Sequence, residues 1–146
     1  MTDPKHCIDV CNRLLRGERS AVETYDKAIE KYGDKPVLTD LRRIREEHAD
    51  AVAKLESNVL SMGGTPDTGS GAWGAFANTV QSTANLFGAG SAIEALESGE
   101  EAGASDYKYA LEDDEVMDSC KGLIRNSLLP QTEAHISQLK ILQDVA

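Results

Sequence analysis

The chain has 146 residues, a length that suits one domain with a single hydrophobic core. Its 25 acidic and 15 basic residues give a net charge of -10, which repels phosphate backbones and anionic lipid and so argues against nucleic-acid and membrane partners. Aromatic residues make up only 5%, and long stretches rich in Ala, Leu, Glu and Lys favour helices and exclude an all-β domain.

The sequence carries no recognisable targeting or membrane signal. It contains no run of about 18 apolar residues, and its first ten residues lack the basic and then apolar layout of a secretory signal. Its three cysteines, an odd number, do not make a disulfide framework and are expected to be reduced thiols. We therefore expect a soluble, cytoplasmic protein in which residues 1–146 form a single domain.

The first half of the chain predicts two long helices, at residues 4–32 and 35–62. Core-type side chains recur at steps of four and three along both segments, which is the spacing of helices packed lengthwise against one another. The midpoint of each apolar seam is polar, with Glu18 in the first helix and Arg45 and His48 in the second.

The second half predicts two more helices, at residues 91–112 and 114–144, whose seams are interrupted by Glu100 and His135. A turn-rich connection at residues 63–90 joins the two halves. This connection is long enough to run the length of a bundle about 40 Å tall. A crossover bundle is therefore favoured over a plain up-and-down one.

The two halves resemble each other in sequence. Glu18 and Tyr25 recur 82 residues later as Glu100 and Tyr107, and each Glu follows a Gly. Each Tyr shares the helix face of its Glu, so we expect its hydroxyl to bond a carboxylate in the core. Two related helical hairpins are the simplest account of this pattern.

The crossover topology makes a prediction about the cysteines. It brings the start of the last helix back to the end where the first helix begins, so Cys120 should lie near Cys7 and Cys11. Cys7 and Cys11 are one helical turn apart with His6 beside them, which is a local spacing that a metal accepts. Without a second ligand pair, however, we expect these thiols to act as small buried apolar side chains.

The four polar seam midpoints should meet in the bundle interior, because an unpaired buried carboxylate is costly. A Glu and a His from each hairpin make half of the carboxylate-bridged dinuclear metal site of ferritin-like bundles. The other half requires a Glu three residues before each His, on the same face of the helix. The chain has Arg45 and Thr132 at those positions.

One interpretation of this centre is a charge network without metal. Arg45 would supply the positive charge and pair with Glu18 or Glu100 through a bidentate guanidinium bridge. Glu47 is expected to point away from the centre, because it precedes His48 by one residue and a helix turns about 100° per residue.

The other interpretation is a site at which iron or manganese binds Glu18, His48, Glu100 and His135. The helix register leaves an alternative open. Glu18 and His48 are 30 residues apart whereas Glu100 and His135 are 35 apart, which would place His135 about one turn out of level. Gln131, one turn before His135, could then face Glu100 instead.

The connection carries an apolar face made by Trp73, Phe76 and Phe87. No basic residues flank this face, so we expect it to pack on the bundle or on a second subunit rather than on a membrane. Trp73 and Phe76 should be at least partly covered. A homo-oligomer formed through helix faces or through the 73–87 segment stays open.

Motifs across nearly the whole chain carry a family resemblance. They are GGTPDTGSGAWGAF from residue 63, ALESGEEAGASDYKYAL from residue 95 and TEAHISQLKIL from residue 132. With these motifs the chain resembles the bacterial DUF2383 family, four-helix-bundle proteins of the ferritin-like superfamily. The resemblance implies a ferritin-like bundle with a crossover, and it implies no reaction because the family is defined by unknown function.

The predicted fold is thus an all-α, ferritin-like four-helix bundle with a long crossover between its second and third helices. For function we favour a non-enzymatic cytoplasmic bundle, a stress-related or interaction protein with a degenerate centre and no cofactor. The alternative is an oxidoreductase or iron-handling protein that binds iron or manganese. No nucleophile elbow, phosphate loop or dinucleotide fingerprint is present in the sequence.

Overall fold

The computed structural model describes residues 4–31, 37–71, 73–74, 76–78, 80 and 89–145, and these residues form an all-α bundle. Its helices are α1 (Pro4–Lys31), α2 (Leu38–Ser61), α4 (Ala89–Glu112), α5 (Asp118–Leu123), the π-helical η1 (Ile124–Leu128) and α6 (Leu129–Val145). The last three follow one another without a break and act as one long helix. The main helices pack in pairs, α1 with α2 and α4 with α6, which confirms the predicted helical class.

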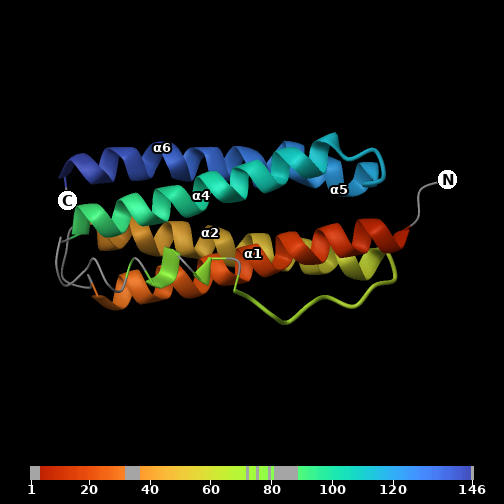
Figure 1. The fold of residues 1–146 in the computed structure, drawn as a ribbon, viewed down its shortest axis with the longest axis horizontal. Helices are drawn as coiled ribbons and strands as arrows, with labels where there is room; N and C mark the ends of the chain where they lie inside the picture. Colours follow the sequence, from red (N-terminus) through yellow and green to blue (C-terminus); the bar gives the residue numbers. More distant parts are fainter. Residues whose placement is uncertain are drawn as a thin grey trace.

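The long connection between α2 and α4 crosses the bundle. In Figure 1, α2 ends at the side of the picture where α1 begins, whereas α4 begins at the opposite side. As a result α1 and α4 run antiparallel, and α5 begins near the start of α1. The Sγ atoms of Cys11 and Cys120 lie 2.7 Å apart, which confirms that these cysteines share one end of the bundle.

The helix boundaries differ from the predicted ones at several ends. The second helix begins at Leu38 and the third at Ala89, while residues 32–36 lie outside the described part of the chain. The last helix begins at Asp118 rather than at residue 114. The reason is local, because Asp113 accepts the backbone N–H of Glu115 (2.9 Å) and Met117 is extended, which holds the chain outside the helix until Asp118.

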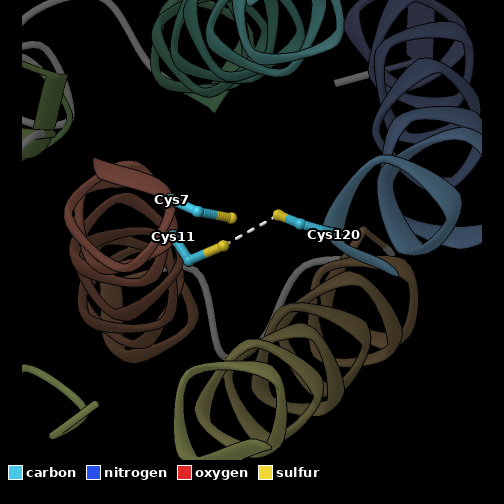
Figure 2. Close-up of side chains that lie close together, drawn as sticks. All are labelled: Cys7, Cys11 and Cys120. Atoms are coloured by element: carbon cyan, nitrogen blue, oxygen red, sulfur yellow. Dashed lines mark hydrogen bonds between the residues drawn. The ribbon is translucent and has the colours of Figure 1, made fainter. Parts of the chain in front are cut away.

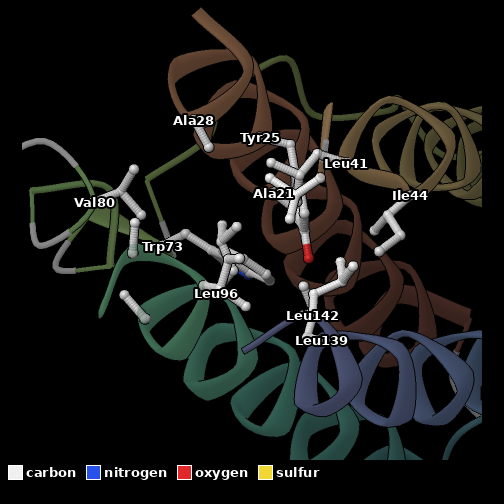
Figure 3. Packing of buried hydrophobic residues seen from close by; sticks show 14 residues of the cluster. Ala21, Tyr25, Ala28, Leu41, Ile44, Trp73, Val80, Leu96, Leu139 and Leu142 are labelled. Atoms are coloured by element: carbon white, nitrogen blue, oxygen red, sulfur yellow. The ribbon is translucent and has the colours of Figure 1, made fainter. Parts of the chain in front are cut away.

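Two apolar clusters fill the bundle, one toward each end. The first, shown in Figure 3, joins side chains from all four main helices and from the connection, including Tyr25, Leu41, Ile44, Trp73, Leu96, Leu139 and Leu142. The second lies at the other end and includes Cys7, Cys11, Leu15, Leu55, Val59, Cys120, Ile124 and Leu128. Between the positions of these clusters along each helix lies one buried polar layer, which the next subsection describes.

Part of the connection is packed against the bundle. Trp73 is 5% exposed, and its backbone N–H donates to Ser20 Oγ at 2.8 Å. Its indole lies on α4 at Gly99, where a Cβ atom would come within 2.6 Å of the ring. Phe76 is partly buried beside it, so the predicted cover of both residues is confirmed, whereas Phe87 lies outside the described residues.

The last helix contains one wide π-helical turn, η1, just before Pro130. Pro130 has no N–H to donate to the carbonyl of Asn126, and its ring would clash with that carbonyl in a regular α-helix. The wider π-helical turn relieves the clash between the Pro130 ring and this carbonyl, so the helix continues past Pro130. Within the described ranges, none of the helices is sufficiently long and apolar to cross a membrane.

Candidate metal centre

The polar layer takes one side chain from each main helix: Glu18 from α1, His48 from α2, Glu100 from α4 and His135 from α6. Each of them is at most 7% exposed. The four residues that the apolar seams singled out do come together in the structure. Their burial means that every charge among them needs a partner inside the bundle.

His48 lies between two carboxylates. Its Nδ1 is 2.5 Å from Glu18 Oε2, and its Nε2 is hydrogen-bonded to Glu100 Oε1. Burial alone would lower the pKa of His48, but the negative charges of Glu100 and Glu18 raise it to about 10. Without a metal, His48 is therefore a buried cation at neutral pH.

His135 contacts two carboxylates as well. Its Nε2 is 2.8 Å from Glu47 Oε1, and its Nδ1 lies 3.2 Å from Glu100 Oε1. The expectation that Glu47 points away from the centre is thus wrong. Glu47 does lie to the side of His48 on α2, but that side faces α6, and its long side chain reaches His135.

The contact between His135 and Glu100 also corrects the alternative based on helix register. His135 is level with Glu100, so Gln131, which is partly buried, is not needed at that position. The second hairpin has five more residues between its Glu and its His than the first, and two places before His135 accommodate them. Residues 113–117 form a non-helical connection, and η1 adds residues in a turn wider than that of an α-helix.

Two buried tyrosines donate to the glutamates across the hairpins. The hydroxyl of Tyr25 on α1 donates to Glu100 Oε1 at 3.0 Å, and that of Tyr107 on α4 donates to Glu18 Oε1. Burial, and then the adjacent carboxylate, raises the pKa of each phenol well above its usual value. Both tyrosines therefore stay protonated donors, as their shared face with the glutamates suggested.

Glu100 remains ionised in spite of its burial. Burial alone would raise the pKa of Glu100, but the positive charge of His48 and the contact with His135 lower it to about 2. The centre thus holds a permanent negative charge at Glu100, flanked by two imidazoles.

Arg45 lies outside this centre, contrary to the expectation that it replaces a metal. Its Nε is 2.9 Å from Asp26 Oδ1 and its Nη1 is 2.8 Å from Glu46 Oε1, with 31% of the side chain exposed. Ile44, the residue before it, takes the interior position. The hydroxyl of Thr132 donates to the Leu128 carbonyl of its own helix turn, so neither position that would carry a bridging Glu adds a charge to the centre.

The centre holds buried polar atoms that the described residues leave without hydrogen bonds. They include Glu100 Oε2 and His135 Nδ1. Such atoms are rare in folded proteins and commonly mark a bound ion or water.

A cavity of about 50 Å³ lies beside Glu100. Its inner wall includes Glu18, His48 and Glu100, and its outer part is lined by the exposed Arg13 and Asp106 between α1 and α4. The volume holds roughly three water molecules at about 15 Å³ each. The centre is therefore reachable from the surface by small species.

The donor atoms fit a metal ion. One ligand atom each from His48, Glu100 and His135 lie within 4.8 Å of one another. Metal–donor bonds of about 2.1 Å place neighbouring ligand atoms about 3 Å apart, so small shifts bring all three onto one ion. Two imidazoles and one carboxylate with open positions form the ligand set typical of non-haem iron(II).

The second ring nitrogen of each His supports the same interpretation. His48 Nδ1 faces Glu18, and His135 Nε2 faces Glu47. A carboxylate behind each imidazole fixes its tautomer and orients its free nitrogen, as it commonly does for metal-binding histidines. Sequence reasoning assigned Glu18 as a ligand and missed Glu47, whereas the structure places each of them against one ring nitrogen of a His, where it can orient the imidazole.

Of three comparisons with known proteins, one found a match, to a protein family. A protein-family model described as "Domain of unknown function (DUF2383)" matches residues 6–113. No curated protein matches the chain, and no solved structure matches it either. Because the family match covers well over half of the chain, the protein belongs to the DUF2383 family.

Proposed function

We propose that this protein binds a single iron(II) or manganese(II) ion at the centre of its bundle, through His48 Nε2, His135 Nδ1 and the carboxylate of Glu100. The observation that carries the proposal is the pair of buried atoms, Glu100 Oε2 and His135 Nδ1, that have no hydrogen-bond partner among the described residues. His135 Nδ1 lies 3.2 Å from Glu100 Oε1 but makes no hydrogen bond to it. Glu100 Oε2 and His135 Nδ1 both present lone pairs to the centre when the proton of His135 is on Nε2, toward Glu47.

The donor chemistry favours these metals. Imidazole and carboxylate ligands suit iron(II) and manganese(II), and geometry rather than raw affinity selects between divalent ions. A dinuclear site would need a further carboxylate at the position of Arg45 and of Thr132, and the chain has none there. One ion is thus the number that these ligands support.

We also propose that the bundle is of the ferritin-like type. Three features support this: the antiparallel α1 and α4, the long connection between α2 and α4, and the Glu and His that each hairpin sends to the centre. The centre is then a simpler version of the ferritin-like carboxylate site, which holds one metal ion in place of two.

The size of the cavity limits what can react there. A bound metal would supply Lewis acidity or one-electron chemistry. The protein residues hold the two imidazoles in place, donate Tyr25 and Tyr107 hydroxyls to the carboxylates and keep bulky molecules out. A cavity of about 50 Å³ admits only reactants of a few atoms, such as dioxygen or a peroxide, which suits iron handling or oxidation chemistry.

One observation favours a second candidate, a non-enzymatic bundle with a metal-free charge network. His48, with a pKa of about 10, can itself supply the positive charge between Glu18 and Glu100 that the sequence suggested for Arg45. In that case the centre serves stability alone.

Metal titration separates the two candidates. Chelator-treated protein is titrated anaerobically with iron(II) and, separately, manganese(II). We expect one ion per chain, at least a tenfold loss of affinity in His135→Ala, and unchanged affinity in the control Arg45→Ala, which alters only surface pairs. Failure of the wild-type protein to take up either ion, or His135→Ala affinity equal to wild type, would refute the metal site and leave the charge network.

A further inference from the structure

A second group of potential ligands lies at the end of the bundle where α1 begins. Cys7 and Cys11 project from α1 toward Cys120 of α5, as Figure 2 shows. All three thiols are fully buried, and their Sγ atoms lie within 4.8 Å of one another. The group is separate from the central site, because Cys11 and Glu18 are seven residues, or about 10 Å of helical rise, apart on α1.

The fold brings these thiols together from distant parts of the sequence. Cys7 and Cys11 are four residues apart and therefore share one face of α1. The crossover returns the chain to this end, where Met117 donates its backbone N–H to Cys7 Sγ at 3.4 Å and α5 presents Cys120. Asn58 of α2 accepts a hydrogen bond from Cys11 Sγ at 3.6 Å.

The thiols have different acidities. The hydrogen bond between Cys11 and Cys120, and then burial, raise the pKa of Cys11, whereas the same hydrogen bond lowers the pKa of Cys120. Burial raises the pKa of Cys7.

We propose that Cys7, Cys11 and Cys120 form a three-coordinate thiolate site for a soft monovalent cation, copper(I). Three sulfurs bound at about 2.3 Å in a trigonal plane lie about 4 Å apart, which is within the 4.8 Å limit of the group but requires the Cys11 and Cys120 Sγ atoms, 2.7 Å apart here, to separate by about 1 Å. Thiolate ligands select copper(I) and other soft metals over the ions that suit imidazole and carboxylate.

The surroundings favour three ligands rather than four. The site lies in the apolar cluster that includes Val10, Leu15, Val59 and Ile124. A structural zinc site is closed by four strong N, O or S ligands, whereas the neighbouring polar side chain in the described structure is the neutral amide of Asn58. Copper(I) is satisfied by the three sulfurs alone.

A disulfide between Cys11 and Cys120 is the alternative use of this group. It would involve two of the thiols and leave Cys7 without a role. The two possibilities therefore differ in what Cys7→Ala does, since a metal site loses a ligand and a disulfide loses nothing.

The test is an anaerobic copper(I) titration of the reduced protein against a chromogenic copper(I) chelator. We expect one tightly bound copper(I) per chain, and an at least hundredfold lower affinity in each of Cys7→Ala, Cys11→Ala and Cys120→Ala. The control Val10→Ala removes apolar volume from the same cluster on α1 and should keep wild-type affinity. X-ray absorption of the loaded protein should show three sulfur neighbours at about 2.3 Å.

A second measurement needs no variant and so does not depend on the variants folding. Copper(I) should protect all three cysteines of the wild-type protein from alkylation, as counted by mass spectrometry, and should leave manganese(II) binding at the centre unchanged. Unchanged copper(I) affinity in Cys7→Ala, protection of two thiols only, or preferential uptake of zinc(II) would overturn the copper(I) site.

Discussion

Replacing His48 by Ala tests the electrostatics of the centre in the metal-free protein. The substitution removes the cation that contacts both Glu18 and Glu100 and leaves two carboxylates in a layer that is at most 7% exposed. Arg45→Ala is the matched control on the same helix, because it removes a full charge whose ion pairs in the described structure, with Asp26 and Glu46, lie at the surface.

The size of the effect follows from the pKa of His48. A pKa of about 10 in the folded protein, against 6.5 when unfolded, stabilises the fold fully below pH 6.5 and loses this contribution as the pH rises through 10. At pH 7 this pKa shift corresponds to about 4 kcal/mol in the free energy of unfolding. Breaking a buried ion pair costs a similar amount, roughly 3–5 kcal/mol. The exposed Arg45 pairs should contribute less than about 1 kcal/mol.

The assay is urea unfolding followed by circular dichroism at pH 7 in the presence of a chelator. We expect His48→Ala to lower the free energy of unfolding by about 4 kcal/mol and Arg45→Ala by less than about 1 kcal/mol. The difference between wild type and His48→Ala should shrink steadily as the pH rises from 6.5 to 10, where the contribution of the His48 charge is nearly gone. Equal costs for the two variants, or a loss of less than about 1 kcal/mol in His48→Ala, would refute the reasoning.

Two further predictions concern the connection and the metal. Gly99→Ala should lower the free energy of unfolding by about 1–3 kcal/mol and shift the fluorescence emission of Trp73 to the red, because the added Cβ would lie 2.6 Å from the indole. The control Gly103→Ala places its Cβ in open space and should raise the free energy of unfolding by up to about 1 kcal/mol. Unshifted Trp73 emission in Gly99→Ala would contradict the packing. Iron(II) binding at pH 7 should release one proton per ion, because His48 must give up its Nε2 proton to become a ligand. Calorimetry in two buffers of different ionisation enthalpy measures this, and binding without proton release would exclude His48 as a ligand.

The helices and the polar layer were predictable because both follow from side-chain spacing. Steps of three and four residues place one apolar face on each helix, and an interruption in that face must be buried with it. Glu18, His48, Glu100 and His135 were identified in this way. The length of the connection likewise predicted the crossover, and with it the approach of Cys120 to Cys7 and Cys11 that the structure confirms.

The contacts within the layer were harder to predict, because they depend on side-chain reach and helix rotation. Arg45 and Ile44 are neighbours in sequence, and only the packing of α2 decided that Ile44 takes the interior. Glu47 reaches His135 across a helix interface that no intrahelical spacing describes. The position of His135 along the bundle axis, opposite Glu100, depends partly on the wide π-helical turn η1, which a count of residues does not reveal.

The most direct test of the central claim is the anomalous scattering of crystals grown from manganese(II)-loaded protein. The account predicts one strong peak between His48 Nε2, His135 Nδ1 and the carboxylate of Glu100, with Glu18 and Glu47 behind the two imidazoles. A centre without a peak, in which His48 Nε2 still lies at hydrogen-bond distance from Glu100, would contradict it.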